Sequence, residues 1–305
     1  MPSSFNSFWK LIINVIYIAR PWSFLMTIAS VTIGVTYVYY EFNIFNLAIY
    51  LITLIGAISL HAYTNVINDY FDTLYGVDKP GAPTTRYRPH PIISGIFKPH
   101  HILRISIAYL FIAALTGLSL YFLGRPLILF LGLIGALISL EYTGPPLKYK
   151  YKGLGELAVF IVWGPLMFLG SNYAQTGLIL FKPVLISFPI GLLVAAVLLI
   201  DEIRDYEYDK FSNIKTLPII IGQQNALKLY YILTTLPFIL VTSFVIINIL
   251  KVSSLIIFLT LPKLIDLIKH FSKQIPDVAA PQTSKFTLFF ATFYTIGIIL
   301  SKIFI

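Results

Sequence analysis

The segment from Asn65 to Asp78 carries side chains that could hold a metal ion. Asp69 and Asp72 stand three residues apart, and on a helix this spacing places them on one face, close to Asn68. Two carboxylates at that spacing repel each other unless a cation neutralises them. Because the set offers oxygen atoms and contains neither His nor Cys, it predicts a hard cation such as Mg²⁺.

A second acidic set lies in the other half of the chain. Asp201, Asp205 and Asp209 recur every four residues, which predicts one stripe of three carboxylates along a helix. Both sets directly follow a long apolar run, and this arrangement predicts a single site assembled from two helix ends. Asp78 and Glu207 fit the helical faces less well. A lone Asp could simply end a helix at the water interface, but five at matching positions favour a metal site.

Basic side chains near both sets could bind phosphate. A diphosphate ester is held by Mg²⁺, which bridges its oxygens to carboxylates, with Arg or Lys on the remaining oxygens. The candidates for these contacts are Arg86, Arg88, Lys148, Arg204, Lys210 and Lys215. Because Arg204 lies off the stripe of Asp201 and Asp205, we expect it to point away from the metal ions.

Other polar and aromatic residues near the acidic sets give weaker signals. His61 lies one turn before Asn65 and could touch a substrate, although a hydrogen-bonded core histidine is the simpler interpretation. Tyr70, Tyr142 and Tyr206 could stabilise a cation through their ring faces.

The composition indicates what kind of scaffold positions these residues. Of the 305 residues 57% are hydrophobic and only 11% charged, and the mean hydropathy is +0.83, which predicts an all-α polytopic membrane protein. The absence of cysteine excludes disulfides and thiolate metal sites. The net charge of +9 is best explained by Lys and Arg in cytoplasmic loops, and without a nucleic-acid motif we expect no nucleic-acid partner.

Apolar runs of spanning length predict nine transmembrane helices within a single domain over residues 1–305. They cover about residues 21–40, 47–67, 102–122, 126–142, 154–174, 183–200, 228–249, 252–268 and 286–304. The short apolar run from Leu11 to Ala19 lacks a convincing cleavage site. We therefore expect an interfacial helix there rather than a signal peptide.

The distribution of basic residues predicts the orientation. If the N-terminus is cytoplasmic and nine spans alternate, 18 of the 22 Lys and Arg residues fall on the cytoplasmic side. The exceptions are Arg125, Lys182, Lys251 and Lys302. Such a bias is typical of cytoplasmic loops in the cell membrane, and it places both acidic sets on the cytoplasmic side.

Two halves of the chain, roughly residues 20–142 and 154–268, share a plan, and a last helix at 286–304 follows them. In each half an apolar helix ends in spaced carboxylates, basic residues come next, and another helix begins. We interpret this as a weak internal repeat that brings the acidic ends face to face. Five prolines between Asp78 and His101 exclude one long helix in that loop.

The two acidic motifs, Asn68-Asp69-Tyr70-Phe71-Asp72 and Asp201-X₃-Asp205-X₃-Asp209, resemble the signature motifs of the UbiA superfamily of intramembrane aromatic prenyltransferases. The resemblance covers almost the whole chain and extends to Arg20-Pro21-Trp22-Ser23, Arg88-Pro89, Ser94-Gly95 and Tyr142-Thr143-Gly144-Pro145-Pro146. Gly153-Leu154-Gly155-Glu156 and Gly76-Val77-Asp78 look closest to the menaquinone branch, which includes 1,4-dihydroxy-2-naphthoate polyprenyltransferases. The second motif departs from that branch, whose members usually carry an Asn pair in place of Asp201-Glu202.

This resemblance implies nine helices around a central cavity, two Mg²⁺ ions and a polyprenyl diphosphate donor. It implies a metal–diphosphate shell made of Asn68, Asp69, Asp72, Asp201, Asp205 and Asp209. It implies diphosphate contacts from Arg20, Arg86, Arg88, Lys148 and Lys215, with Tyr142 near the reacting carbon. The residues expected to act in catalysis itself are Asp69, Asp72, Asp205, Asp209 and Tyr142.

Together these observations predict a membrane enzyme that transfers a polyprenyl group to an aromatic quinone precursor, such as a dihydroxynaphthoate. An aromatic acceptor needs flat apolar walls and a few hydrogen-bond partners, which Asn65 and His61 could supply. One alternative is a glycerol-phosphate lipid acceptor, as in digeranylgeranylglyceryl phosphate synthases. It would need a further basic group at the cavity mouth, where Arg20 and Arg204 are the obvious candidates. The other alternative is a divalent-cation transporter.

Overall fold

The computed structural model describes residues 2–303, without the side chains of residues 2–8, 86, 87, 182 and 303. Its α-helices are α1 (Pro2–Ile18), α2 (Phe24–Phe42), α3 (Leu47–Leu74), α4 (Thr84–Tyr87), α5 (Pro99–Phe122), α6 (Leu127–Glu141), α7 (Gly155–Ile161), α8 (Met167–Thr176), α9 (Phe188–Arg204), α10 (Tyr206–Phe211), α11 (Leu217–Ile221), α12 (Gln223–Ile246), α13 (Leu261–Phe271) and α14 (Ala279–Ile303). Shorter helical segments are η1 (Pro21–Ser23), η2 (Tyr149–Lys152), η3 (Val162–Leu166), η4 (Lys182–Ser187) and η5 (Val252–Thr260). The described residues contain no strand, so the all-α prediction is confirmed.

Seven helical stretches of the described chain are long and apolar enough to cross a membrane. They are Pro21–Phe42, Leu47–Leu74, Pro99–Phe122, Gly155–Thr176, Pro183–Arg204, Gln223–Ile246 and Ala279–Lys302. The predicted spans at 126–142 and 252–268 correspond to shorter elements. The first is the 15-residue α6, and the second is the 3₁₀-helix η5 followed by α13.

Small residues and a proline shape the centre of the bundle. The stretch from α7 to α8 passes through the π-helical turn η3, which contains Pro165. Proline removes a backbone donor, and a wider turn accommodates it without ending the helix. Gly191 of α9 packs directly on this turn, because a Cβ atom there would lie 3.1 Å from Cα of Gly164 and 2.9 Å from the Phe160 carbonyl. Glycine at 191 thus permits the close approach of α9.

Large aromatic residues fill the interior between α9, α12 and α14. Tyr230, Phe290 and Tyr294 are fully buried. Both tyrosine hydroxyl groups have partners: Tyr294 donates to the Ile186 carbonyl over 3.0 Å, and the Tyr230 hydroxyl lies 2.9 Å from that of Thr283. These buried rings stabilise the packing of α9, α12 and α14 against one another.

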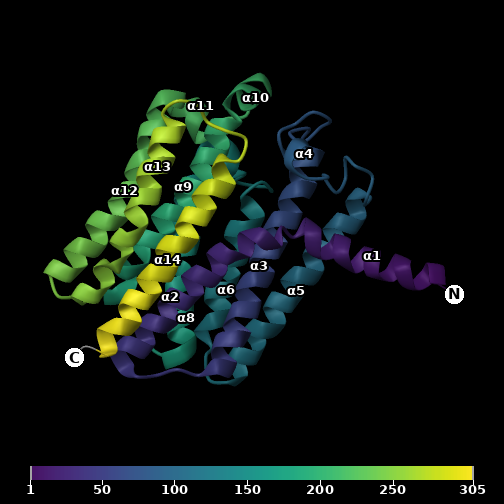
Figure 1. The fold of residues 1–305 in the computed structure, drawn as a ribbon. Helices are drawn as coiled ribbons and strands as arrows, with labels where there is room; N and C mark the ends of the chain where they lie inside the picture. The colour runs from purple at the N-terminus through teal and green to yellow at the C-terminus, as the bar shows by residue number, and fades with distance from the viewer. Residues whose placement is uncertain (1, 304–305) are drawn as a thin grey trace.

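The two acidic helix ends lie at the same end of the bundle. Figure 1 shows α4, which follows α3, and α10, which follows α9, at the top of the view. Helix α1 projects sideways from the body, and its exposed Trp9, Leu11, Ile13 and Ile16 agree with the predicted interfacial helix. Helix α3 extends seven residues beyond the predicted span, so the first acidic motif is part of that helix.

Candidate active site

A cavity of about 1440 Å³ opens between the helices. Polar residues from both acidic motifs line one part of it, among them Asn68, Asp72, Asp201, Asp205 and Asp209. Apolar residues of α3, α5, α6 and η3 line another part, including Ile52, Leu60, Leu110, Ile128, Leu129 and Leu166. The cavity therefore joins an anionic region to an apolar region large enough for a lipid tail.

On α3, Asn68 and Asp72 lie one turn apart and face the cavity. Both are buried. Oδ1 of Asn68 has no hydrogen-bond partner among the described residues. Asp72 accepts a hydrogen bond from Nζ of Lys150 over 2.6 Å and another from the hydroxyl of Tyr151. Lys150 and Tyr151 were not among the predicted site residues, because only the 3₁₀ turn η2 brings them to α3.

Asp69 is fully buried, and it pairs with two guanidinium groups instead of lining the cavity. Arg88 Nη2 donates to both Asp69 oxygens over 2.6 and 2.9 Å, and Arg20 Nη2 donates to Oδ1 over 2.5 Å. Burial opposes the charge of Arg20, but the carboxylates of Asp69, Asp78 and Asp72 together outweigh burial and raise the pKa of Arg20. Both arginines line the cavity, so Asp69 positions the cations predicted to contact phosphate.

The second acidic motif departs from the predicted single stripe. Helix α9 ends at Arg204, and α10 begins at Tyr206, so the helix breaks at Asp205. Arg204 was predicted to point away from the metal ions, and this expectation is wrong, because Arg204 contacts two of the carboxylates predicted to bind them. Its Nε and Nη2 donate to the two Asp205 oxygens over 2.8 and 2.9 Å, and its Nη1 lies 2.7 Å from Oδ1 of Asp201.

Asp209 lies on α10, beyond the break. It is buried and accepts a hydrogen bond from Thr216 over 3.1 Å. Burial raises the pKa of Asp209 to about 7, against the lowering effect of Lys150. A bound cation would favour the ionised form of this carboxyl group.

A direct contact joins the two motifs. The Tyr208 hydroxyl of α10 donates to the Val77 carbonyl over 2.8 Å, although 131 residues separate them. Both residues line the cavity. The loop after α3 and the helix after α9 therefore meet at the cavity, as the two-motif prediction requires.

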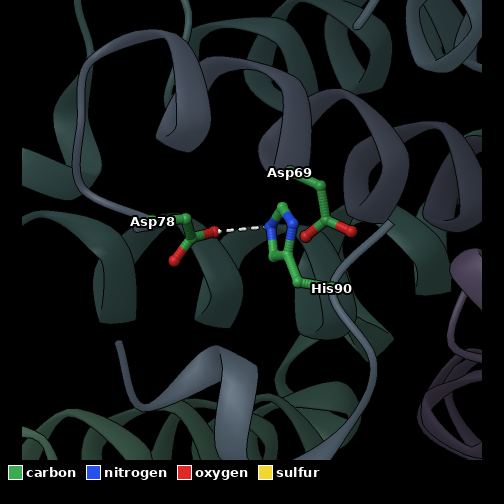
Figure 2. Close-up of side chains that lie close together, drawn as sticks. All are labelled: Asp69, Asp78 and His90. Carbon is green, nitrogen blue, oxygen red and sulfur yellow. Dashed lines mark hydrogen bonds and ion pairs between the residues drawn. The ribbon is translucent and has the colours of Figure 1, made fainter. Parts of the chain in front are cut away.

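Asp69, Asp78 and His90 offer ligand atoms within 4.8 Å of one another. Figure 2 shows the His90 ring between the two carboxyl groups. His90 Nδ1 accepts from the backbone amides of Ile92 and Ile93, so Nε2 carries the hydrogen and donates to Asp78 over 3.1 Å. Burial would raise the pKa of Asp78, but the hydrogen bond from His90 and the charge of Lys150 lower it to about 2. Because both ring nitrogens of His90 already have hydrogen-bond partners, this cluster holds the loop after α3 in place.

Three further predicted phosphate contacts, Lys148, Lys210 and Lys215, are not part of the cavity lining. Lys148 has its Nζ 3.6 Å above the ring of Tyr75, and Lys210 and Lys215 are exposed. The side chain of Arg86 lies outside the described residues. Lys285, at the start of α14, lines the cavity although it was not predicted to.

The predicted acceptor contacts lie together on the cavity wall. His61 is buried between Thr27 and Ser23, at 2.8 and 3.2 Å, which agrees with a hydrogen-bonded core histidine. Asn65 Nδ2 donates to the Ala19 carbonyl over 2.9 Å. Tyr142 also lines the cavity, and its ring lies edge-on to that of Tyr149 with the two centroids 5.4 Å apart.

The donor atoms of the cavity fit Mg²⁺. Carboxylate and amide oxygens are the ligands that this hard cation prefers. Asn68 and Asp72 present such oxygens on one wall, Asp205 and Asp209 on the other, and Asn68 Oδ1 has no partner among the described residues.

Comparison with known proteins identifies the class of this enzyme. Residues 27–293 match the UbiA prenyltransferase family, and the chain belongs to it. The 1,4-dihydroxy-2-naphthoate octaprenyltransferase of Bacillus subtilis (strain 168) is 30% identical over 288 residues, which cover 93% of this chain and 91% of that protein.

Two solved structures share the fold. A UbiA homolog from Archaeoglobus fulgidus, bound to GPP and Mg²⁺, aligns with a TM-score of 0.64 at 18% identity, over 94% of this chain and 99% of that one. A digeranylgeranylglyceryl phosphate synthase aligns with a TM-score of 0.63 at 23% identity, over 96% and 99%. The chain is therefore a multi-pass integral membrane prenyltransferase that uses a prenyl diphosphate. The transporter alternative is set aside.

Proposed function

We propose that this enzyme transfers a polyprenyl group to an aromatic quinone precursor of the dihydroxynaphthoate type, in menaquinone biosynthesis. The observation that carries the proposal is the continuity of one cavity from paired carboxylates and arginines to a long apolar wall. A polyprenyl diphosphate has the same two parts: a charged head and an apolar tail. The relative from Bacillus subtilis, which spans nearly the whole chain, supports a naphthoate acceptor.

The diphosphate head lies between the two acidic motifs in this proposal. Asn68, Asp72, Asp201, Asp205 and Asp209 would hold two Mg²⁺ ions, and Asp69 would orient the arginines instead of contacting the metal. When bound, Mg²⁺ stabilises the negative charge that grows on the departing diphosphate. Arg20, Arg88 and Lys150 place further positive charge at the head, and Lys150 takes the role that the sequence predicted for Lys148.

The protein provides the environment in which the allylic carbon reacts. The buried cavity wall excludes water, which would otherwise capture the prenyl group. Tyr142 lies beside the diphosphate region, and its ring face can stabilise positive charge on the allylic carbon. Asn65, on the same wall, supplies a polar contact for an aromatic acceptor, whereas both ring nitrogens of His61 are engaged by Thr27 and Ser23.

A glycerol-phosphate lipid is the second candidate acceptor. The similarity in fold to a digeranylgeranylglyceryl phosphate synthase supports this candidate. Lys285 supplies the extra basic group that such an acceptor needs. Lys285 is exposed, and the cavity cations Arg20, Arg88 and Lys150 are assigned to the diphosphate in this proposal. The naphthoate acceptor therefore remains the better match for the inner cavity.

Product analysis separates the two candidates. Purified enzyme with geranylgeranyl diphosphate is offered a panel of quinone precursors and a geranylgeranylglyceryl phosphate, with and without Mg²⁺, and products are identified by mass spectrometry. We expect prenylated dihydroxynaphthoate, formed only with Mg²⁺. Turnover of the glycerol-phosphate lipid alone would overturn the assignment in favour of the sister enzyme.

We also propose nine membrane spans, with α6 and the η5–α13 segment as the two short ones, and related halves at residues 20–142 and 154–268. The N-terminus and the acidic end of the bundle face the cytoplasm in this arrangement. The excess of basic residues at that end supports the orientation.

A further inference from the structure

Two buried carboxyl groups near the cavity are left unused by the diphosphate site. Glu156 lies in the first turn of α7 and Glu202 in the last turn of α9, and each exposes only 6% of its surface. Helix α7 packs along α9, which brings the two side chains within hydrogen-bonding reach of each other. None of their four oxygen atoms receives a hydrogen bond from a donor group in the described part of the chain.

Burying two carboxyl groups side by side destabilises the folded protein unless a hydrogen-bond donor or a shared proton is available. Carboxylates only accept hydrogen bonds, so two of them facing each other need a donor from elsewhere or a proton between them. A buried carboxyl oxygen without a donor destabilises the folded protein. In a native structure such a group calls for an explanation, and a ligand with hydroxyl hydrogens would provide the missing donors.

The position of the pair indicates which ligand this is. Glu202 lines the cavity, and so does Tyr142. A Cβ atom on Gly155 would lie 3.6 Å from Oε1 of Glu202 and 3.6 Å from the Tyr142 ring, so these groups adjoin the same glycine. The carboxyl pair therefore lies beside the aromatic wall at which the prenyl group is proposed to react.

We propose that Glu156 and Glu202 form the subsite that binds the hydroxyl groups of the aromatic acceptor, an inference that rests on the proposed function. Glu202 accepts a hydrogen bond from a phenolic hydroxyl of the acceptor, and Glu156 positions the Glu202 side chain. A phosphate group at the same position would meet carboxyl groups instead of cations. The subsite thus favours acceptors that place a hydroxyl group at the carboxyl pair and disfavours acceptors that place a phosphate there.

Kinetics with a matched pair of acceptors test this subsite. The full-length enzyme, its Glu202→Gln and Glu156→Gln variants, and the control Glu207→Gln on the exposed surface of α10 are assayed with Mg²⁺ and geranylgeranyl diphosphate. The acceptors are a dihydroxynaphthoate and its methyl ether, which lacks one hydroxyl hydrogen. We expect Glu202→Gln to raise the acceptor KM about tenfold, with the donor KM changed less than about twofold. The preference for the free hydroxyl should fall by a similar factor, whereas Glu207→Gln should behave like the wild type.

Thermal unfolding provides a second readout. The amide in Glu156→Gln or Glu202→Gln donates to the remaining carboxylate, so we expect Tm to stay or to rise. A lower Tm with an unchanged preference between hydroxyl and ether would make the pair structural and overturn the subsite. The subsite is also overturned if wild type uses dihydroxynaphthoate and both variants keep its acceptor KM. If wild type turns over only the glycerol-phosphate lipid, the proposed function fails, and the subsite fails with it.

Discussion

The Nζ atom of Lys150 lies 2.6 Å from Oδ2 of Asp72, although 78 residues separate the two in the chain. Burial opposes the charge on Lys150, but Asp72, Tyr151 and Asp78 together outweigh burial and raise the pKa of Lys150. Lys150 is thus a charged group in the cavity wall. Lys148, two residues earlier, lies over the ring of Tyr75. The short turn η2 decides which lysine faces the site.

Replacing Lys150 and Lys148 one at a time shows which of the two lysines acts on the diphosphate. We expect Lys150→Met to lower kcat/KM for the prenyl diphosphate about 100-fold, because a cation at the diphosphate is lost. Lys148→Met serves as the matched control, with a loss of about threefold or less, since its ammonium group is held by an aromatic ring. Steady-state kinetics in detergent measure both. A larger loss in Lys148→Met than in Lys150→Met would support Lys148 as the diphosphate contact, as predicted from the sequence.

Helical spacing explains which parts of the site were predictable from sequence. The four-residue interval from Asn68 to Asp72 is local, and both residues face the cavity as a helix requires. Asp69 belongs to the same motif, yet it faces Arg20 and Arg88. Three-residue spacing alone cannot say which of two carboxylates faces the cavity.

Residues placed by tertiary contacts were beyond sequence reasoning. Lys150 reaches Asp72 only through the turn η2, and Glu156 meets Glu202 only because α7 packs on α9. The break at Asp205 also escaped prediction, since four-residue spacing continues across it. Apolar runs, in contrast, reveal the long helices directly, because each run must cover the membrane thickness.

Removing a proposed metal ligand should abolish most turnover. We expect Asp72→Asn and Asp205→Asn each to lower kcat about 100-fold, because an amide oxygen holds Mg²⁺ less well than a carboxylate. Raising the Mg²⁺ concentration should recover part of the activity. Asp266→Asn, on the exposed face of α13, is the control. Wild-type activity in either site variant would remove that carboxylate from the metal shell.

Asp69 should affect stability more than Asp72 does. Asp69→Asn leaves the buried guanidinium of Arg88 and that of Arg20 without their carboxylate, so we expect the free energy of unfolding to fall by about 3 kcal/mol. Denaturant unfolding in detergent, again with Asp266→Asn as control, measures this. An Asp69→Asn protein of normal stability that needs more Mg²⁺ would identify Asp69 as a metal ligand, as the sequence predicts.

The orientation can be tested on a chain that has no cysteine of its own. Single cysteines at the exposed positions Lys98, Lys210 and Gln274 should react with a membrane-impermeant thiol reagent only from the cytoplasmic side. Cysteines at Phe45 and Leu178 should react only from the opposite side. The excess of Lys and Arg at the acidic end is the physical reason. Labelling of the Lys98 and Lys210 positions from opposite sides would contradict a site built from both motifs.

The apolar region of the cavity should set the length of the prenyl tail. Gly132 of α6 lines the cavity, and a Cβ atom there would meet nothing within 4 Å, so a larger side chain can enter the free space. A phenylalanine occupies volume that a tail would otherwise fill. Leu137→Phe is the matched control, because Leu137 lies on the same helix, is 48% exposed and is not part of the cavity lining.

We expect Gly132→Phe to lower kcat/KM about tenfold or more for long donors, and to change it less than about twofold for geranyl diphosphate. Leu137→Phe should keep the wild-type order of donors. Competition between donors of different length, with products resolved by mass spectrometry, measures the shift. A uniform loss for every donor would mean that the substitution at Gly132 disturbs the diphosphate region instead of the tail. An unchanged order of donors would place the tail elsewhere, along a wall to which Gly132 does not belong.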